Sequence, residues 1–560
     1  MATKYKIILV ATLLWVSGCS LKEKIYDTVI SDTFIKSEDD VFYQLNGVYS
    51  FFPTYASFKS NLPYQIIDGG DDIAVTNSTK RLFNERTISF SNTYFTSAWS
   101  RFYNTINNAN SLMATLERLP EGIVSDAYKS RSLGELYFMR AFSYFYLVRL
   151  YGGVPLHTEP TQGGSDFYSA RNSVAEVYNQ IFEDFTKAAE QCIPFSQQPA
   201  REFGHATRGA AQAMLSLAYL TYANDIDLGT EQGDSKKYYQ LAEDYADSVI
   251  QSNEYSLVSN YADLWNVALE KNAYKEVIFA IQFTRDPTGA STNSRGSELC
   301  YYLEPTTRYN VCGNPTNGQG AGTTRLQPWF VQMYTEGEYA GDYRSEVSFL
   351  TRWSYKGTSR DAIAFPETAK SNEVIEAYPY INKYVDPDGL QARNNENDFD
   401  IIRLAEVYLI KAEAENELNG PTEDAYNAFN KLRERARQAD GNMRTTPADL
   451  QPGLSKEQFR LAIFNERGLE LVGEGHRWFD AIRMRYLDNK RTMEQYRYED
   501  FYPAMTKAAP SYNKTTHTWG GGRVQPLNVV SWTPRFLLWP IPSPEIDANP
   551  NMTQNSEYGW

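Results

Sequence analysis

The sequence predicts a mostly α-helical fold, in which a scaffold of paired helices supports a large loop-rich face and a few short strands. Three observations support this fold class. Long segments repeat apolar residues at helical spacing, these segments follow one another in pairs, and irregular stretches rich in Gly, Asn and Pro separate the pairs. With 560 residues the chain exceeds one ordinary core, which favours several domains or a repeat array.

The first predicted pair covers residues 133–153 and 173–192. Apolar residues surround most of the first segment, and a helix with that pattern is expected to be buried. Gly152 and Gly153 predict where it ends, because glycine readily adopts the left-handed conformation that terminates helices.

The second pair covers residues 206–225 and 237–255. Its first member is lined with small residues, and its second member is amphipathic. Small residues let neighbouring helices approach closely, which is typical of tetratricopeptide-like repeats. We therefore interpret this pair as one tetratricopeptide-like unit.

The third pair covers residues 399–420 and 423–438. A further helix is predicted to begin at Ser455, because Gln458 three residues later completes the spacing of a capping box. An early helical segment, residues 97–119, is predicted to start the fourth unit.

Four long stretches look irregular: residues 54–96, 285–330, 354–398 and 490–540. Loops of this length in a compact protein are usually functional. One short strand is predicted at residues 276–283.

Composition excludes several classes of function. The formal net charge of −15 argues against nucleic acid, which requires a basic surface. With only 4 His and no paired CxxC, we predict no metal site and no cofactor. A bound calcium ion near residues 385–389 is conceivable from VDPDG, but the stretch lacks most of an EF-hand loop, so none is predicted.

The N-terminus is typical of an exported lipoprotein. Lys4 and Lys6 precede an apolar run, residues 7–16, that is too short to span a bilayer. The run ends in VSGC, which resembles a lipoprotein cleavage box. We predict a signal peptide over residues 1–18 and acylation of Cys19, which would anchor the chain in a membrane. The alternative is ordinary secretion, with Cys19 incidental.

Export also allows disulfide formation. A bond between Cys300 and Cys312 would stabilise the fold by about 3 kcal/mol in the chain-entropy model. The alternative is two unpaired thiols. Cys192, at a predicted helix end, is expected to be a buried free thiol.

Several motifs in order resemble the SusD/RagB family of surface lipoproteins. They are the cleavage box at Cys19, GELYFMRAFSYFYLVRLYGGVPL, FDIIRLAEVYLIKAEAENELNG, ERGLELVGEGHRWFDAIR and the closing LLWPIPSPEIDANPNMTQN. The resemblance implies one SusD-like domain over residues 19–560, in which an N-terminal part (about 19–310) and a C-terminal part (about 311–560) interleave. It also implies four tetratricopeptide-like units with ligand bound on the loop-rich face.

The resemblance further implies partners and a location. The partner would be a SusC-like TonB-dependent transporter, and the ligand an oligosaccharide or polysaccharide. The lipid anchor would hold the protein in the outer membrane, facing the cell exterior.

The family motifs themselves look structural. In ERGLELVGEGHRWFDAIR, three glutamates stand four residues apart, so they share one helical face if the helix is continuous. We expect nearby arginines to neutralise them in a salt-bridge network rather than a catalytic carboxylate pair, and we assign the same structural role to His476, Glu413 and Glu415. The glutamates are Glu466, Glu470 and Glu474, and the expected arginines are Arg467, Arg477 and Arg483.

A sugar site needs aromatic rings for stacking and polar side chains for directional hydrogen bonds. The stretch CYYLEPTTRYNVC meets this requirement within an otherwise polar loop. The alternative is that its tyrosines pack onto the scaffold. The candidates here are Tyr301, Tyr302 and Tyr309, with Glu304, Arg308 and Asn310 as polar partners and Trp329 completing the surface.

Two further clusters could contribute ligand contacts. The first lies between residues 64 and 99, where Trp99 is equally compatible with a helix core. The second is THTWGGGRV, whose glycines do not lie between a strand and a helix as a phosphate loop requires. The residues are Tyr64, Asp71, Asp72, Arg81, Asn92, Tyr94 and Trp99 in the first, and Trp519 and Arg523 in the second.

The leading functional hypothesis is a non-catalytic glycan-binding lipoprotein that delivers oligosaccharides to the transporter. A peptide-binding uptake lipoprotein of the RagB type is the first alternative. A glycoside hydrolase is less favoured, since nothing in the spacing of Asp71, Asp72 and Glu304 requires a catalytic pair. A pure scaffold is the third alternative.

Overall fold

The structure is a computed structural model, and it describes residues 35–69, 72–76, 91–161, 168–285, 295–308, 320–370, 372–389, 391–505, 508–521 and 531–558. The lipidation site Cys19 and the predicted signal peptide lie outside these residues. Among the described helices, none is both long and apolar enough to cross a membrane.

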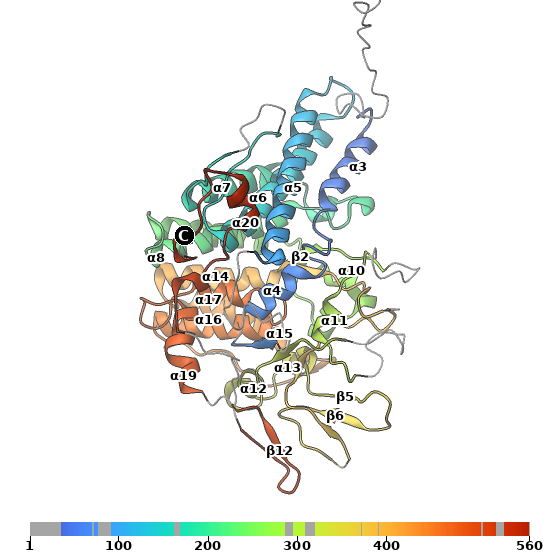
Figure 1. Ribbon diagram of the computed structural model, residues 1–560, viewed down its shortest axis with the longest axis vertical. Helices are drawn as coiled ribbons and strands as arrows, with labels where there is room; N and C mark the ends of the chain where they lie inside the picture. The colour runs from blue at the N-terminus through green and yellow to red at the C-terminus, as the bar shows by residue number, and fades with distance from the viewer. Residues whose placement is uncertain are drawn as a thin grey trace, which may run out of the picture.

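Five consecutive helices form the N-terminal half of the scaffold. Each packs against the next along the chain, and together they occupy the upper part of Figure 1 in blue to green. This arrangement confirms the predicted fold class of paired helices. The helices are α5 (Thr93–Arg118), α6 (Asp126–Tyr151), α7 (Val174–Gln191), α8 (Arg208–Asp227) and α9 (Ser235–Gln251).

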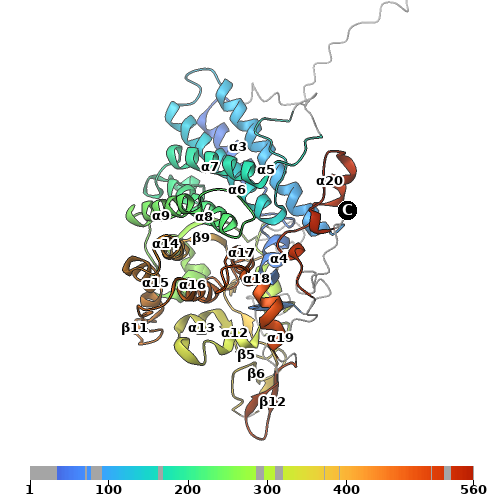
Figure 2. The same cartoon turned by 90° about the vertical axis from the view of Figure 1, so that its left-hand side faces the viewer.

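The array continues through the C-terminal half. Helix α14 (Leu404–Asn419) packs against α9 and then against α15 (Glu423–Ala436) and α16 (Lys456–Glu470), and α17 (Arg477–Arg483) follows. Helix α3 (Glu38–Tyr49) packs on α5 and α6. Figure 2 shows α14, α15 and α16 directly below α8 and α9.

The helix ends follow from local sequence. Ser173 and Ser455 each form a capping box with the residue three positions on, which satisfies backbone donors that have no partner within the helix. Gly152 follows α6 with φ of 75°, a backbone conformation that residues other than glycine rarely adopt.

One predicted helix is partly a strand. Residues 399–420 were expected to be helical throughout, but Phe399–Arg403 forms β9, which pairs antiparallel with β2 (Val277–Ile281). Both strands are buried on both faces. The predicted strand at 276–283 is confirmed as β2. Pairing with β2 therefore overrode the helical pattern of this segment.

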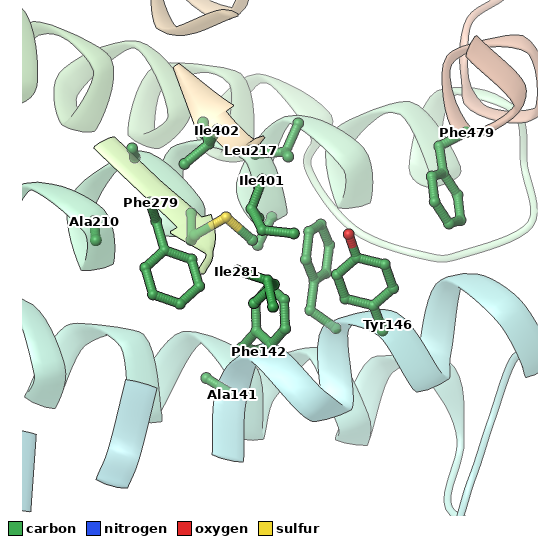
Figure 3. Packing of buried hydrophobic residues seen from close by; sticks show 14 of the residues in the cluster. Ala141, Phe142, Tyr146, Ala210, Leu217, Phe279, Ile281, Ile401, Ile402 and Phe479 are labelled. Carbon is green, nitrogen blue, oxygen red and sulfur yellow. The ribbon is translucent and has the colours of Figure 1, made fainter. Parts of the chain in front are cut away.

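The two strands lie inside the helical array. Figure 3 shows Phe279 and Ile281 of β2 and Ile401 and Ile402 of β9 among side chains of α6 and α8. Phe279 makes an edge contact with Phe142 of α6, with ring centroids 5.8 Å apart. The hydrophobic core thus joins residues from both halves of the sequence.

The four stretches expected to be irregular contain short elements. The added helices are α4 (Asn61–Gly69), α11 (Leu299–Leu303), α12 (Pro328–Gln332), α18 (Met493–Tyr496), a π-helix at Arg497–Phe501 and α19 (Tyr502–Ala504). The added strands are β1 (Ala74–Thr76), β3 (Thr324–Leu326), β6 (Asp361–Ile363), β7 (Val374–Ile375), β8 (Tyr380–Ile381), β12 (Ser511–Asn513) and β13 (Thr518–Gly520).

A few short elements lie outside those stretches. They are α10 (Glu270–Ala273), α13 (Tyr343–Ser348), β4 (Phe349–Leu350), β5 (Arg352–Ser354), β10 (Gln438–Ala439), β11 (Asn442–Met443) and α20 (Ser543–Ala548).

The glutamates of the motif ERGLELVGEGHRWFDAIR form a buried ionic network. Glu470 accepts hydrogen bonds from Arg344 at 2.9 Å and from Arg403 at 3.2 Å, and it also pairs with Arg435. Glu466 lies 2.7 Å from Arg344. These partners belong to segments far apart in the sequence, so the network ties the fold together.

The predicted network is confirmed, but its predicted partners are wrong. Helix α16 ends at Glu470, so Glu474 does not share its helical face; it binds Arg403 and Lys383 instead. The three arginines expected as partners bind other carboxylates. Arg467 pairs with Glu406 and Asp480, Arg477 with Asp72, and Arg483 with Glu413 and Asp480.

The other motif residues have the structural roles expected of them. His476 is at the N-cap of α17, with its Nδ1 atom 3.3 Å from Glu406, and burial lowers its pKa. Glu415 accepts hydrogen bonds from Asn419 and Thr422. Cys192 is a buried thiol at the C-cap of α7.

Candidate functional site

The aromatic stretch that begins at Cys300 forms the short helix α11. Cys300, Tyr302 and Leu303 are buried, whereas Tyr301 is half-buried and lies at the surface. The backbone of Ala321 and Thr323 donates hydrogen bonds to the carbonyl oxygens of this helix. The tyrosines are therefore held on a fixed element rather than on an unsupported loop.

Tyr302 holds α11 against the N-terminal half of the chain. Its ring stacks on Tyr64 of α4, with centroids 4.7 Å apart and planes inclined by 28°. Its hydroxyl accepts a hydrogen bond from Ser60 at 3.1 Å, and burial raises the pKa of that hydroxyl. Tyr302 therefore packs onto the scaffold, as the alternative interpretation of these tyrosines expected.

Tyr301 forms the centre of the exposed surface. The Arg393 guanidinium lies over its ring, 3.8 Å from the centroid, in cation–π geometry. Both side chains are half-buried. A guanidinium presents several N–H donors in a fixed plane, so this pair combines a ring with directed hydrogen-bond donors.

Two buried charges lie behind this pair. The Glu298 amide donates to the Lys59 carbonyl at 3.1 Å. Burial raises the pKa of Glu298, although Arg393 and Lys59 partly oppose that rise. Among the described residues, the Oε2 atom of Glu298 has no hydrogen-bond partner. It is therefore a buried acceptor that the described residues leave without a partner.

We call this constellation the α11 site. It combines exposed or half-buried rings with guanidinium donors, and Tyr55 is its most exposed ring at 48%. Burial raises the pKa of the Tyr302 hydroxyl, and the nearby Glu298 and then Tyr55 add to that rise. The site consists of Tyr55, Lys59, Glu298, Tyr301, Tyr302 and Arg393.

Arg308 and Glu304 form a structural pair beside the site. Glu304 is fully buried, and Arg308 Nη1 lies 2.5 Å from its carboxylate and 3.0 Å from Asn382. Glu304 is thus not available as the exposed polar partner that its sequence position suggested. Gly320 is required here, because a Cβ atom would lie 1.9 Å from the Glu304 carbonyl oxygen.

Two predicted ligand residues belong to the core instead. Trp99 is 3% exposed and packs against Tyr103 and Tyr151, with centroids 5.0 Å and 5.1 Å away. Asp72 is 2% exposed, with Arg477 and Arg497 each 2.6 Å from it. Packing buries Trp99 and ion pairing buries Asp72, so neither side chain forms part of a surface site.

Other predicted residues lie away from the α11 site or outside the described residues. Trp329 packs against Phe501, with centroids 4.9 Å apart, and Tyr94 is half-buried in the first turn of α5. The remaining candidates stay predictions, as does the disulfide. They are Asp71, Arg81, Tyr309, Asn310, Cys312 and Arg523, all outside the described residues.

Trp519 lies on the β12–β13 hairpin at the lower end of the molecule in Figure 1. Its ring packs against Tyr512 of the opposite strand, with centroids 5.1 Å apart. Its Nε1 donates to the Glu367 carbonyl at 2.8 Å. The hydrogen bond anchors the hairpin to the segment that contains Glu367.

The VDPDG segment places its first aspartate against protein donors. Asp386 accepts hydrogen bonds from the backbone of Asp388 and Glu396, and Arg285 lies 3.6 Å away. Within the part of the chain that the structure describes, no group of three or more His, Cys, Asp and Glu side chains is arranged to hold a metal ion.

Sequence reasoning missed four residues of the site: Tyr55, Lys59, Glu298 and Arg393. Arg393 stands in ARNNEND, a polar stretch with no signal that places it beside Tyr301. Glu298 lies two residues before Cys300, where the aromatic stretch begins, and its position could have suggested a role.

Two family models match the sequence. The SusD family model matches residues 275–560, and a model described as "Starch-binding associating with outer membrane" matches residues 27–220. The chain is 27% identical to SusD-like protein P2 of Formosa agariphila, over 99% of both chains. It is 26% identical to the starch-binding protein SusD of Bacteroides thetaiotaomicron, over 78% of this chain and 74% of the relative.

Solved structures share the fold. A SusD homologue of Bacteroides thetaiotaomicron has a TM-score of 0.76 at 21% identity and covers 94% of this chain and 98% of its own. A laminarin-binding SusD-like protein has a TM-score of 0.66 at 22% identity, covering 94% and 100%. A structure described with a xylogluco-oligosaccharide has a TM-score of 0.68 at 23% identity, covering 90% and 97%.

Proposed function

This chain belongs to the SusD family, and from that premise we propose that it is a non-catalytic glycan-binding protein that captures oligosaccharides at the α11 site. The observation that carries the proposal is the Arg393 guanidinium stacked on the half-exposed ring of Tyr301. Relatives described as starch-binding and laminarin-binding support the same class of ligand.

The chemistry of the α11 site suits a sugar. A pyranose presents apolar C–H faces that pack on aromatic rings, and Tyr55 and Tyr301 provide rings with accessible surface. Its hydroxyls need donors and acceptors at fixed positions. The guanidinium of the half-buried Arg393 provides donors. Because α11 is anchored through Tyr302, its residues lose little conformational entropy when a ligand binds.

The rest of the proposal concerns delivery. Acylation of Cys19 would anchor the protein in the outer membrane, facing the cell exterior. From there it would pass oligosaccharides to a SusC-like TonB-dependent transporter. The family model described as associating with the outer membrane supports this location.

The test is a binding screen of the mature chain against oligosaccharides and peptides by calorimetry, with a reducing-sugar assay on the same samples. We expect saturable binding to one glycan class without cleavage. Arg393→Ala and Tyr301→Ala should each weaken that binding at least about tenfold, corresponding to about 1.4 kcal/mol. Tyr43→Ala is the matched control, because Tyr43 is a 68% exposed tyrosine of α3.

Two results would contradict the proposal. Peptide binding in place of glycan binding would assign the chain to the RagB-type alternative, and cleavage would refute a non-catalytic role. Glycan binding that both variants leave unchanged would move the ligand away from the α11 site.

A further inference from the structure

A cavity that shares no lining residue with the α11 site lies between the helical array and the C-terminal segments. Its volume is about 370 Å³, within the range of small-molecule sites. Helices α6, α7, α8 and α17 form its walls, and residues 537–538 close one side. Most of the lining is apolar: Val148, Val174, Leu228, Ile482, Leu537 and Leu538, together with the rings of Tyr178 and Phe479.

Two carboxylates line this mainly apolar cavity, Asp225 and Glu231. Both side chains are half-buried, and no hydrogen bond from the described residues engages either carboxylate. The backbone carbonyl of Asp225 accepts from Thr230 and Glu231, at 3.0 Å and 3.2 Å. These contacts fix the turn and do not involve the carboxylate of Asp225.

The surroundings of Asp225 are unfavourable for a negative charge. The residue lies in the last turn of α8, where the helix dipole is negative. Burial raises the pKa of Asp225 to about 8, and Glu231 contributes to that rise. Burial also raises the pKa of Glu231. A cation placed between the two carboxylates would relieve both effects.

The cations that line the cavity are engaged by other groups, and Arg483 opposes the rise in the Asp225 pKa only in part. The guanidinium of Arg483 is bound to Glu413 and Asp480. The guanidinium of Arg149 lies between the rings of Phe145 and Phe479, 3.9 Å and 4.1 Å from their centroids, and its Nε donates to the Phe145 carbonyl. Lys490 is an exposed residue at the rim.

We propose that this cavity binds a small organic ammonium ion, whose charged group lies against Asp225 and Glu231 and whose apolar body packs against Tyr178, Phe479 and the aliphatic walls. The site is separate from the α11 site, so it does not depend on the proposed glycan binding.

The test compares benzylamine with benzyl alcohol, which has a similar shape and no charge, by calorimetry on the mature chain. At pH 8.5 we expect benzylamine to bind at least about tenfold more tightly. Asp225→Asn should reduce benzylamine affinity about tenfold and leave benzyl alcohol binding unchanged. Glu190→Gln, at an exposed position of α7, is the matched control.

The pH dependence gives an independent readout. Because Asp225 takes up a proton near pH 8, benzylamine affinity should fall as the pH is lowered from 8.5 to 6.5, and this fall should be much smaller in Asp225→Asn. The variant is isosteric and removes a charge that has no protein partner, so its melting temperature should not decrease. Equal affinity for the two probes, no binding of either, or unchanged benzylamine affinity in Asp225→Asn would overturn the proposal.

Discussion

Glu470→Gln tests whether the motif ERGLELVGEGHRWFDAIR stabilises the fold rather than performs chemistry. Glu470 is fully buried among three arginines, Arg344, Arg403 and Arg435. Burial by itself would raise the pKa of the Glu470 carboxyl, but these guanidiniums hold it far below its usual range. Replacement by glutamine keeps the shape and removes the charge.

The expected loss follows from the burial of the partners. Removing one member of a buried ion pair costs about 3–5 kcal/mol, because the remaining charge is left uncompensated. The unfolding entropy of a chain of this length is roughly 1 kcal/mol per kelvin. Glu470→Gln should therefore lower the melting temperature by about 3–5 °C.

Differential scanning calorimetry at pH 7 measures this shift. Glu190→Gln makes the same chemical change at an exposed position. Its free energy of unfolding should remain within about 0.5 kcal/mol of that of the parent. Glycan affinity per folded molecule should be unchanged, since Glu470 lies outside the α11 site. The reasoning is refuted if Glu470→Gln is as stable as the control, or if it abolishes glycan binding while it remains folded.

Three further predictions concern the site, the pH response and the anchor. Tyr302→Ala should lower the free energy of unfolding in urea by about 3–5 kcal/mol because its ring is buried. Tyr301→Ala should lower it far less, and equal losses would contradict the assignment of Tyr301 to the surface. Burial raises the pKa of Glu270 to about 7. The protonated Glu270 therefore contributes to the free energy of unfolding in full below the ordinary carboxyl pKa, and this contribution is lost as the pH rises through 7. Glu270→Gln should thus flatten the fall in unfolding free energy between pH 5 and 8, and an unaltered slope would reject that pKa. Cys19→Ala should release the protein from membranes, and retention in the membrane fraction without the transporter would contradict acylation.

The helices could be predicted because their determinants are local. The capping boxes at Ser173 and Ser455 and the glycine that ends α6 depend on residues within one turn. Apolar spacing likewise determines which face of α7 is buried before any partner is known. The order of the paired helices was therefore evident from the sequence.

The tertiary structure decided what depends on distant partners. Phe399–Arg403 is a strand because β2 is beside it. Glu470 and Arg344 are 126 positions apart, and Arg477 and Asp72 are 405 apart, so charge pattern alone could predict a network but not its pairs. The same holds for Arg393 on Tyr301 and for the cavity at Asp225. Local hydrogen bonds and caps determine helices, whereas ion pairs, stacked rings and cavities exist only where packing brings separate segments together.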